Sequence, residues 1–367
     1  MTDANHFWQR LPKPFFVLAP MEDVTDVAFR TLIARKGSPD VTFTEFTSAD
    51  GLVLAPEQGQ RMLRKKLEFT KAERPIVAQL FSASPDRMEK AAALVQELGF
   101  DGLDINMGCP VDEVVKSGCG SGMIKNPPLA REIIRAAKRG APNLPVSVKT
   151  RIGFNTDELD TWLPELLAEE PAVVTIHART RKEMSAVPAH WDAVARAVLI
   201  RDSLGSKTLI VGNGDVKDIA HARQKVLETG CDGVMLGRAI YGNPWLFKEL
   251  RIQRSASLQN ASVPLVVRSG TPRGSEASAP RIASESIALT ELAIGPREKL
   301  ETLAEHIQLF DELMTGFANF AVMKKHFKAY VNGWDNAKEL RVRLMETNTP
   351  EEALRVIATG LRALGGI

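Results

Sequence analysis

Apolar positions along the first 250 residues fall into short, nearly uninterrupted runs. Eight such runs recur, and segments with apolar positions at helical spacing separate most of them. The runs predict strands at residues 15–21, 41–46, 75–80, 102–105, 145–151, 172–177, 208–215 and 233–238. Because the runs show no in–out alternation, both faces of these strands are expected to be buried, as in a parallel sheet covered by helices.

The alternation of strands and helices predicts an α/β fold, a (β/α)8 TIM barrel over residues 1–250. A doubly wound parallel sheet is the alternative. It is disfavoured because no GxGxxG motif opens the first predicted helix and strands keep arriving at barrel spacing. Helices are expected after Thr25 as N-cap, from Ser84-Pro85 onward, and over residues 128–139.

The composition changes after the predicted barrel. Residues 251–295 are rich in Ser, Ala, Pro and Arg and have little periodicity, which predicts a linker or surface insertion. Helical spacing returns after Gly295-Pro296, with Leu300, Leu303 and Ile307 on one face. A smaller all-helical C-terminal domain is therefore expected over residues 296–367.

Composition and charge narrow the class of protein. The 367 residues are 44% hydrophobic and 25% charged with a formal net charge of +2, which neither requires nor excludes a nucleic-acid partner. The three cysteines favour a reducing compartment over a disulfide framework, and none has zinc-ligand spacing. No secretory leader or membrane-length apolar run is present. A monomeric cytoplasmic protein without membrane contact or bound metal is therefore expected.

Polar residues occur where the predicted strands end. Gln79, Asn106, Lys149, His177 and Asn213 each lie at or near the carboxyl end of a different strand. In a barrel these ends share one rim, which carries catalytic residues, whereas the opposite rim serves stability. A solvated strand end explains any one of these residues equally well, but all of them on one rim indicate an active site.

The stretch from Asp104 to Pro110, which reads Asp-Ile-Asn-Met-Gly-Cys-Pro, places Cys109 on this rim. Three roles are open to its thiol: nucleophile, general acid or small core residue. No His or Lys lies immediately beside it in the sequence to hold a thiolate. Near the usual pKa of about 8.5 the group is mostly a thiol at neutral pH, which favours proton donation.

Two glycine-containing turns close the predicted barrel, one at residues 212–215 and one at residues 236–238. Loops after the seventh and eighth strands are the usual phosphate site of this fold, and Arg238 offers a bidentate clamp. Such a phosphate would place the ring of a cofactor near Lys149 and Gln79, where a lysine can stabilise an anionic reduced flavin. Two purely structural turns are the alternative.

A basic segment lies in the predicted helical domain. Residues 323–343 contain Lys324, Lys325, Lys328, Lys338, Arg341 and Arg343 against only Asp335 and Glu339. A solvated helix face is the simple explanation. A local excess of positive charge in a nearly neutral chain nevertheless favours a phosphate backbone as ligand.

These motifs together resemble the tRNA-dihydrouridine synthase family. The similarity runs through Ala19-Pro20-Met21-Glu22, Ala78-Gln79-Leu80-Phe81, Asp104 to Pro110, Ser117-Gly118-Cys119-Gly120, Val148-Lys149-Thr150-Arg151, His177-Ala178-Arg179-Thr180, Gly212-Asn213-Gly214-Asp215 and Gly237-Arg238. It covers residues 12–250 and, more loosely, the helical region. The 251–295 segment is an insertion that the compact sequence pattern of this family does not contain.

The resemblance implies a barrel that binds FMN, is reduced by NADPH and reduces the C5–C6 bond of specific uridines in tRNA, with Cys109 protonating C5 after hydride reaches C6. It implies cofactor contacts from Pro20, Met21, Glu22, Gln79, Lys149, His177, Asn213, Gly214, Asp215, Gly237 and Arg238. Asn106 and Arg179 would hold the uracil, and Lys324 and Lys325 would contact the tRNA. No metal is implied.

Two other functions remain open at this point. A flavin barrel acting on a free pyrimidine, like a dihydroorotate dehydrogenase, would not need a basic helical domain but would need extra carboxylate anchors for orotate. An RNA-binding protein that keeps the fold without the chemistry would have no use for the full polar rim.

Overall fold

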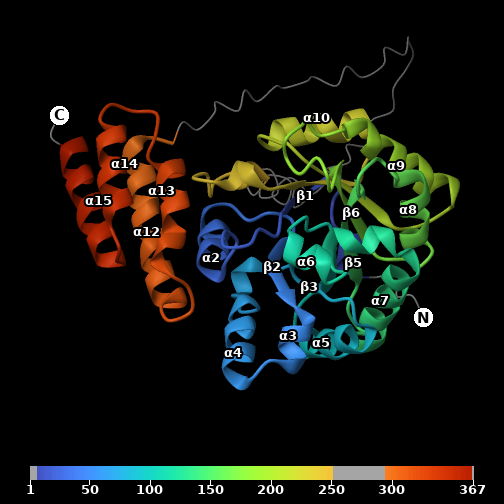
Figure 1. The fold of residues 1–367 in the computed structure, drawn as a ribbon. Coiled ribbons are helices and arrows are strands. Elements are labelled where there is room, and N and C mark those ends of the chain that lie inside the picture. The colour runs from blue at the N-terminus through green and yellow to red at the C-terminus, as the bar shows by residue number, and fades with distance from the viewer. Residues whose placement is uncertain (1–5, 251–293, 366–367) are drawn as a thin grey trace, which may run out of the picture.

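The computed structural model describes residues 6–250 and 294–365. Its centre is a sheet of eight parallel strands in the order β1-β8-β7-β6-β5-β4-β3-β2 (Figure 1). The strands are β1 (Phe15–Leu18), β2 (Thr42–Ser48), β3 (Ile76–Phe81), β4 (Gly102–Met107), β5 (Val146–Gly153), β6 (Val173–Thr180), β7 (Leu209–Asn213) and β8 (Gly233–Leu236). A parallel bridge between Val17 and Val41 joins β1 to the residue before β2 and closes the barrel. The predicted (β/α)8 barrel is confirmed.

Helices surround the barrel and form the C-terminal part. Around the barrel lie α1 (Phe7–Arg10), α2 (Val27–Lys36), α3 (Ala49–Leu54), α4 (Glu57–Lys66), α5 (Pro85–Glu97), α6 (Asp112–Lys116), α7 (Pro127–Gly140), α8 (Leu159–Leu167), α9 (Trp191–Ser203) and α10 (Ile219–Thr229). Short 3-10 helices are η1 (Lys71–Glu73), η2 (Gly120–Lys125), η3 (Arg238–Ile240) and η4 (Phe320–Met323). The C-terminal helices are α12 (Pro296–Met314), α13 (Lys324–Tyr330), α14 (Ala337–Glu346) and α15 (Pro350–Leu364).

The start of α2 corrects one local prediction. Asp26, not Thr25, caps this helix, because its carboxylate accepts a hydrogen bond from Phe29 N at 2.8 Å. The Thr25 hydroxyl instead accepts a hydrogen bond from Met21 N at 2.9 Å, which folds the loop after β1 back on itself. Both residues suit a cap by type, so the sequence alone did not distinguish them.

Two apolar clusters show which way the strand residues point. One cluster fills the barrel interior with alternate strand residues: Phe15, Val17, Ala19, Phe43, Val77, Val173, Leu209, Val211 and Met235. Trp8 closes its amino-terminal end, with ring centroids 5.7 Å from Phe15 and 6.2 Å from Phe43. The intervening strand residues pack against the surrounding helices in the other cluster. The period of two along each strand therefore defines an interior face.

The C-terminal helices lie beside the barrel, next to α2 (Figure 1). Phe29 of α2 stacks on His306 of α12 with ring centroids 4.7 Å apart and meets His326 of α13 edge-on at 4.8 Å. All three side chains are buried. Glu305 adds ion pairs to Arg35 and Lys36 at the edge of this contact. An apolar contact therefore holds the helical part against the barrel.

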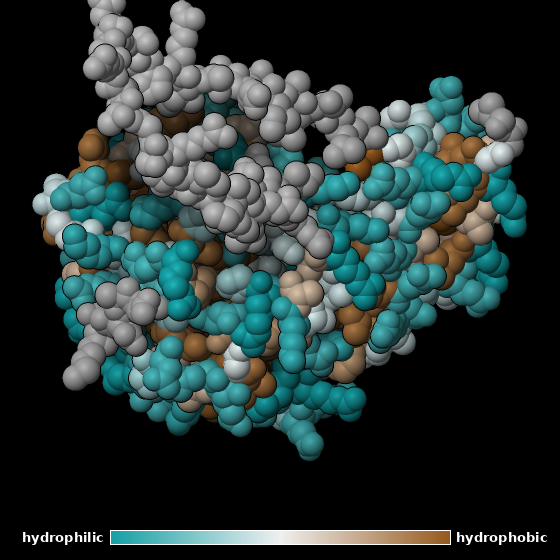
Figure 2. Space-filling view, turned by 180° about the vertical axis from the view of Figure 1, so that it is seen from behind, coloured by the Kyte–Doolittle hydropathy of each residue, from teal (hydrophilic) through white to brown (hydrophobic). Residues whose placement is uncertain are grey.

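The surface and the chain boundaries complete the fold. Seen from behind, hydrophilic residues cover most of the visible face, with apolar residues in smaller groups between them (Figure 2). Within residues 6–250 and 294–365, no helix has the length and apolarity needed to cross a bilayer. The predicted insertion at 251–295 lies almost wholly outside the described residues, so its role stays a prediction.

A buried ion pair fixes the start of α2 against the segment before β3. Arg30 Nε lies 2.7 Å from Glu73 Oε2, and the two residues are 1% and 2% exposed. The guanidinium also donates to the backbone carbonyls of Thr25 and Glu68. Each of the three guanidinium nitrogens of Arg30 thus donates a hydrogen bond inside the protein.

Replacing Arg30 with Met should destabilise the protein strongly, because Glu73 would keep a buried charge without its partner. We expect the free energy of unfolding, measured by urea denaturation, to fall by about 3–5 kcal/mol. Arg139→Met is the matched control, since it breaks only solvent-exposed pairs with Glu89 and Glu132 and should leave the free energy of unfolding nearly unchanged. Equal effects of the two substitutions would contradict this role of the buried pair.

Candidate active site

The register of the sheet brings the predicted polar rim together. Asn106 on β4 pairs with Lys149 on β5, and His177 on β6 pairs with Asn213 on β7. Gln79 lies one strand further round, on β3. The residues on either side of these positions belong mainly to the outer cluster, so the polar side chains belong to the interior face at the carboxyl end of the barrel.

A buried carboxylate organises one side of this interior. Asp104 is 0% exposed and accepts hydrogen bonds from Ser147 Oγ at 2.6 Å and Gln79 Nε2 at 2.7 Å. Gln79 Oε1 in turn accepts from Asn106 Nδ2 at 3.0 Å, and Asn106 Oδ1 accepts from Cys109 N at 2.8 Å. These five residues form the Asp104 chain. Its hydrogen bonds run in one direction, from the Cys109 loop to the carboxylate.

Asp104 and Lys149 lie on the neighbouring strands β4 and β5 and carry opposite charges. Burial raises the pKa of Asp104 to about 6, although hydrogen bonds from Ser147 and Gln79 oppose the shift. Burial lowers the pKa of Lys149 to about 8, an effect that Arg151 adds to and Asp104 opposes. The partly buried Lys149 ammonium donates no hydrogen bond to any residue in the described ranges. It is therefore a donor available to a ligand that carries negative charge or carbonyl oxygens.

The Cys109 thiol is held close to the barrel mouth. The residue is 8% exposed, and its backbone carbonyl accepts from both Ser121 N and Ser121 Oγ at 3.0 Å. Gly120, with a φ of +56°, comes so close that a Cβ there would lie 2.7 Å from this carbonyl oxygen. Burial raises the pKa of the thiol, and Arg151 and Lys149 offset this only in part. Cys109 is accordingly a thiol at neutral pH, which suits proton donation.

Arg151 is a site residue that the sequence reasoning did not single out. Arg151 lies two residues after Lys149 within β5, so the two side chains lie on the same face of the strand. Its Nε donates to Gly108 O at 2.8 Å, and its Nη1 donates to Met184 O at 3.1 Å. Arg151 thus ties the Cys109 loop to the loop after β6. The spacing of two from Lys149 was the signal that could have found it.

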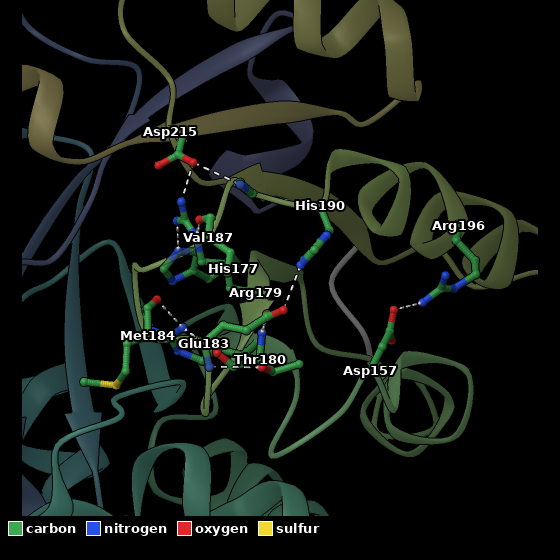
Figure 3. A network of polar contacts seen from close by, with 12 residues as sticks. Asp157, His177, Arg179, Thr180, Glu183, Met184, Val187, His190, Arg196 and Asp215 are labelled. Carbon is green, nitrogen blue, oxygen red and sulfur yellow. Dashed lines mark hydrogen bonds and ion pairs between the residues drawn. The ribbon is translucent and has the colours of Figure 1, made fainter.

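A second polar network lies on the other side of the mouth (Figure 3). Arg179 Nη1 lies 3.1 Å from His177 Nε2, its Nε donates to Val187 O at 2.6 Å, and its Nη2 donates to Asp215. Arg238 Nη2 donates to the other oxygen of Asp215 at 2.9 Å. The Asp215 carboxylate therefore bridges two guanidinium groups. Burial and the neighbouring cations hold the pKa of His177, in the same network, well below its usual value, so the imidazole is neutral.

The loop after β8 lies against the loop after β1, and the end of β7 is bonded to β8. Gly214 has a φ of +136°, a conformation that favours glycine, and Asn213 Nδ2 donates to a backbone carbonyl of β8 at 2.8 Å. A Cβ on Gly237 would lie 3.7 Å from Ala19 Cβ and from Met21 Sδ. The predicted phosphate loops and the predicted flavin-lining segment are thus brought together.

The loop after β1 carries the remaining predicted cofactor residues. Pro20 and Met21 are partly buried, whereas Glu22 is exposed and pairs with Lys66. Carboxylate oxygens of Glu22, Asp23 and Glu45 lie within 4.8 Å of one another. Burial raises the pKa of Glu45 to about 7, and the neighbouring carboxylates add to the shift. Such clusters occur commonly without a cation.

The two predicted tRNA-binding lysines differ in their surroundings. Lys325 Nζ donates to Asp23 O, in the loop after β1, at 2.7 Å. Lys324 is partly exposed and has no hydrogen-bond or ion-pair partner among the described residues. His326, the next residue of the motif, is buried against Phe29. The structure therefore connects Lys325, but not Lys324, to the barrel mouth.

Comparison with protein families decides between the activities that this geometry allows. The family model described as dihydrouridine synthase (Dus) matches residues 17–363. The chain belongs to the dihydrouridine synthase family. The match includes both the barrel and the C-terminal helices, so it covers the polar rim and the basic segment together.

Curated relatives agree over nearly the whole length. The chain is 38% identical to the probable tRNA-dihydrouridine synthase 2 of Bacillus subtilis (strain 168), over 95% of this chain and 94% of that protein. It is 37% identical to the probable tRNA-dihydrouridine synthase of Staphylococcus aureus (strain COL), over 95% and 94%. A solved morphinone reductase aligns with a TM-score of 0.48 and 13% identity over 67% of this chain and 88% of that one, too weakly to carry an argument. The resemblance identified from the motifs is confirmed.

Asp104→Asn should disturb the Asp104 chain, because an amide cannot accept hydrogen bonds at both of its polar atoms. The new N–H₂ would have to lie either against Gln79 Nε2, which is also a donor, or against the Ser147 hydroxyl, which would have to turn from donor to acceptor. A flip of Gln79 would pass the conflict to Asn106. We expect a loss of about 1–3 kcal/mol in the free energy of unfolding and faster alkylation of Cys109 by iodoacetamide.

Asp86→Asn is the control for this substitution, since Asp86 is an exposed residue paired only with Lys90. It should leave both quantities unchanged. If Asp104→Asn behaves like the control, the carboxylate does not set the direction of the chain.

Proposed function

We propose that the protein reduces the C5–C6 bond of uridines in tRNA to dihydrouridine, with hydride from a bound flavin and a proton from Cys109. The reaction class follows from membership of the dihydrouridine synthase family, and the match to relatives named for tRNA extends over 94% of their length. The protein is therefore an oxidoreductase that acts on tRNA. The buried thiol of Cys109 at the barrel mouth is the observation that carries the assignment of the proton donor.

The protein's own contribution to the chemistry is the protonation of C5. A flavin, when bound, supplies hydride to C6 of the uracil ring. Cys109 is kept in its protonated form by burial, so it can give its proton to C5 as charge develops there. The Asp104 chain and Arg151 hold the peptide group before Cys109, and Ser121 holds the Cys109 carbonyl after it, so the backbone that carries Sγ is fixed.

The donor set around the mouth fits the cofactor FMN. The Lys149 ammonium has no hydrogen bond to a described residue and would bond the isoalloxazine ring, beside Gln79 and the neutral His177. At Gly214 and Gly237, which have no side chain, a phosphate would approach the backbone of the two loops, and Arg238 would add charge there. Pro20, Met21, Glu22 and Asn213 would border the same ligand, and Asp215 would hold Arg238 in place rather than meet the phosphate itself.

The substrate contacts follow from unused hydrogen-bonding capacity. Asn106 Nδ2 uses one N–H for Gln79 and keeps another for a uracil carbonyl. Arg179 uses one N–H of each of its three nitrogens for protein partners, which leaves one N–H on each of the two terminal nitrogens. It would therefore contact uracil only through the outer edge of the guanidinium. A uridine stacked in tRNA must leave the stack to reach these groups.

The helical part would bind tRNA outside the extruded base. Its basic segment presents Lys324, Lys328 and Lys338 on the surface, where cations bind phosphates by charge rather than sequence. NADPH would be the reductant of the flavin, as the family resemblance implies. A free pyrimidine as substrate, the alternative raised by the sequence, would have no need of this basic segment.

Cys109→Ala tests the proton donor. The variant should bind flavin and accept electrons from NADPH normally, because the thiol is not needed for either step. Dihydrouridine formation on unmodified tRNA, measured by mass spectrometry of digested tRNA, should fall by about 10²–10⁴-fold.

Cys119→Ala is the matched control, since Cys119 is also buried, and it should leave the rate within a small factor of the wild type. If Cys109→Ala instead loses the flavin, the thiol is structural. Full activity of Cys109→Ala would mean that another group protonates C5.

The pH dependence of flavin binding tests the role of Lys149. Its lowered pKa of about 8 means that the ammonium is charged below pH 8 and loses its proton above it. Flavin affinity, measured by fluorescence quenching, should therefore weaken as the pH rises through about 8. Lys149→Met should bind flavin more weakly at neutral pH and lack this step. A step of equal size in Lys149→Met would assign the transition to another group.

A further inference from the structure

The loop after β1 contains a residue in an uncommon backbone conformation. Asp23 has a φ of +53°, the left-handed region that favours glycine. It directly follows Met21 and Glu22, which the proposed function places beside the flavin. Non-glycine residues persist in this conformation where the surrounding structure holds them.

Two side chains hold the backbone of Asp23 from opposite sides. Its N–H donates to Glu45 Oε1 at 2.7 Å, and Glu45 is a buried residue of β2. Its carbonyl accepts from Lys325 Nζ at 2.7 Å, and the Asp23 carboxylate lies 3.9 Å from the same ammonium. Glu45 belongs to the barrel, whereas Lys325 lies 302 residues away in α13. One half of the clamp on this turn therefore comes from the helical part.

Lys325 is delivered to this position by the packing of its own helix. The neighbouring His326 is buried against Phe29 of α2, and Glu305 of α12 pairs with Arg35 and Lys36 of the same barrel helix. Gly242 also packs closely on α13, since a Cβ there would lie 2.3 Å from Ala329 C. The contact of Lys325 with the turn is thus part of a fixed docking geometry.

We propose that Lys325 is a positioning residue that holds the Asp23 turn, and through it the cofactor loop, in register with the tRNA-binding helices. The inference rests on the proposed function in one respect, namely that the loop after β1 borders the flavin. It separates two lysines that the sequence treats alike: Lys324 has no hydrogen-bond or ion-pair partner among the described residues and would serve tRNA, while Lys325 links the two parts of the protein. Because coupling is reciprocal, tRNA bound to α13 and flavin bound at the mouth stabilise the same arrangement of the loop.

The first test needs no ligand. Hydrogen exchange of the ligand-free full-length protein should show faster exchange of the Asp23 amide in Lys325→Ala than in the wild type. Lys328→Ala is the matched control, because Lys328 lies on the same helix with no ion pair to a described residue, and it should match the wild type. Unchanged exchange in Lys325→Ala overturns the proposal.

The second test asks whether the turn transmits the effect to the cofactor. Lys325→Ala should weaken FMN binding by about twofold to fivefold, the range that a single exposed charge contact supports. Lys324→Ala should leave FMN affinity unchanged and weaken tRNA binding with a shallower salt dependence. The reverse pattern, with Lys325→Ala affecting only tRNA, would make Lys325 an RNA contact and overturn the proposal.

A suppressor separates this mechanism from general destabilisation. Asp23→Gly relieves the unfavourable φ, so the turn should no longer depend on Lys325. In the Asp23→Gly background, Lys325→Ala should cause little further loss of FMN affinity, and additive losses would contradict the mechanism. Failure of the wild type to bind FMN would refute the proposed function and the cofactor half of this inference, while the exchange experiment would still decide whether Lys325 holds the turn.

Discussion

An ionisable carboxylate inside a barrel must be hydrogen-bonded, and this constraint fixes the side of the mouth that carries Cys109. Asp104 accepts from Ser147 and Gln79, which leaves Gln79 only its carbonyl to offer to Asn106. Asn106 must then donate to Gln79 and accept from the backbone of the Cys109 loop. The position of the thiol is thus set by a charge buried several residues away. The same charge faces Lys149 and helps to keep its ammonium protonated near neutral pH.

The opposite side of the mouth is arranged by a shared carboxylate. Asp215 lies between the buried Arg179 and the exposed Arg238, so one loop residue after β7 orients both guanidinium groups. Burial, together with the neighbouring cations, lowers the pKa of His177 and keeps its imidazole neutral in the same region. The two sides are therefore chemically distinct: one holds a buried thiol whose pKa is raised, and the other concentrates positive charge. That division matches a reaction in which a bound anionic cofactor and a proton source act on one base.

Much of the barrel could be predicted from the sequence because apolar runs with Gly and Pro boundaries report strands directly. The polar rim followed from the same pattern, since Gln79, Asn106, Lys149, His177 and Asn213 interrupt apolar strands at one end. The match to the family model and the closed eight-stranded sheet confirm the family and the fold. The roles assigned to individual side chains stay predictions.

What the sequence did not reveal depends on contacts between distant segments. Arg151 lay in the predicted strand, but its role depends on its hydrogen bonds to Gly108 and Met184 in two other loops, which the sequence does not report. The different surroundings of Lys324 and Lys325 depend on how α13 docks, which surface charge does not report. The choice of Asp26 over Thr25 as cap depends on the fold of the preceding loop, where Thr25 already binds Met21. In each case the residue type allowed several partners, and tertiary structure selected one.

The central claim is that one barrel mouth presents a flavin and the Cys109 thiol to the same extruded uracil. A crystal structure of the protein with FMN and a uridine-containing RNA tests it most directly. The account predicts the flavin ring beside Lys149 and the uracil between the ring and Cys109 Sγ, with the Asp104 chain unchanged. A flavin bound elsewhere, or a uracil stacked on the ring with Cys109 pointing away from it, would contradict the account.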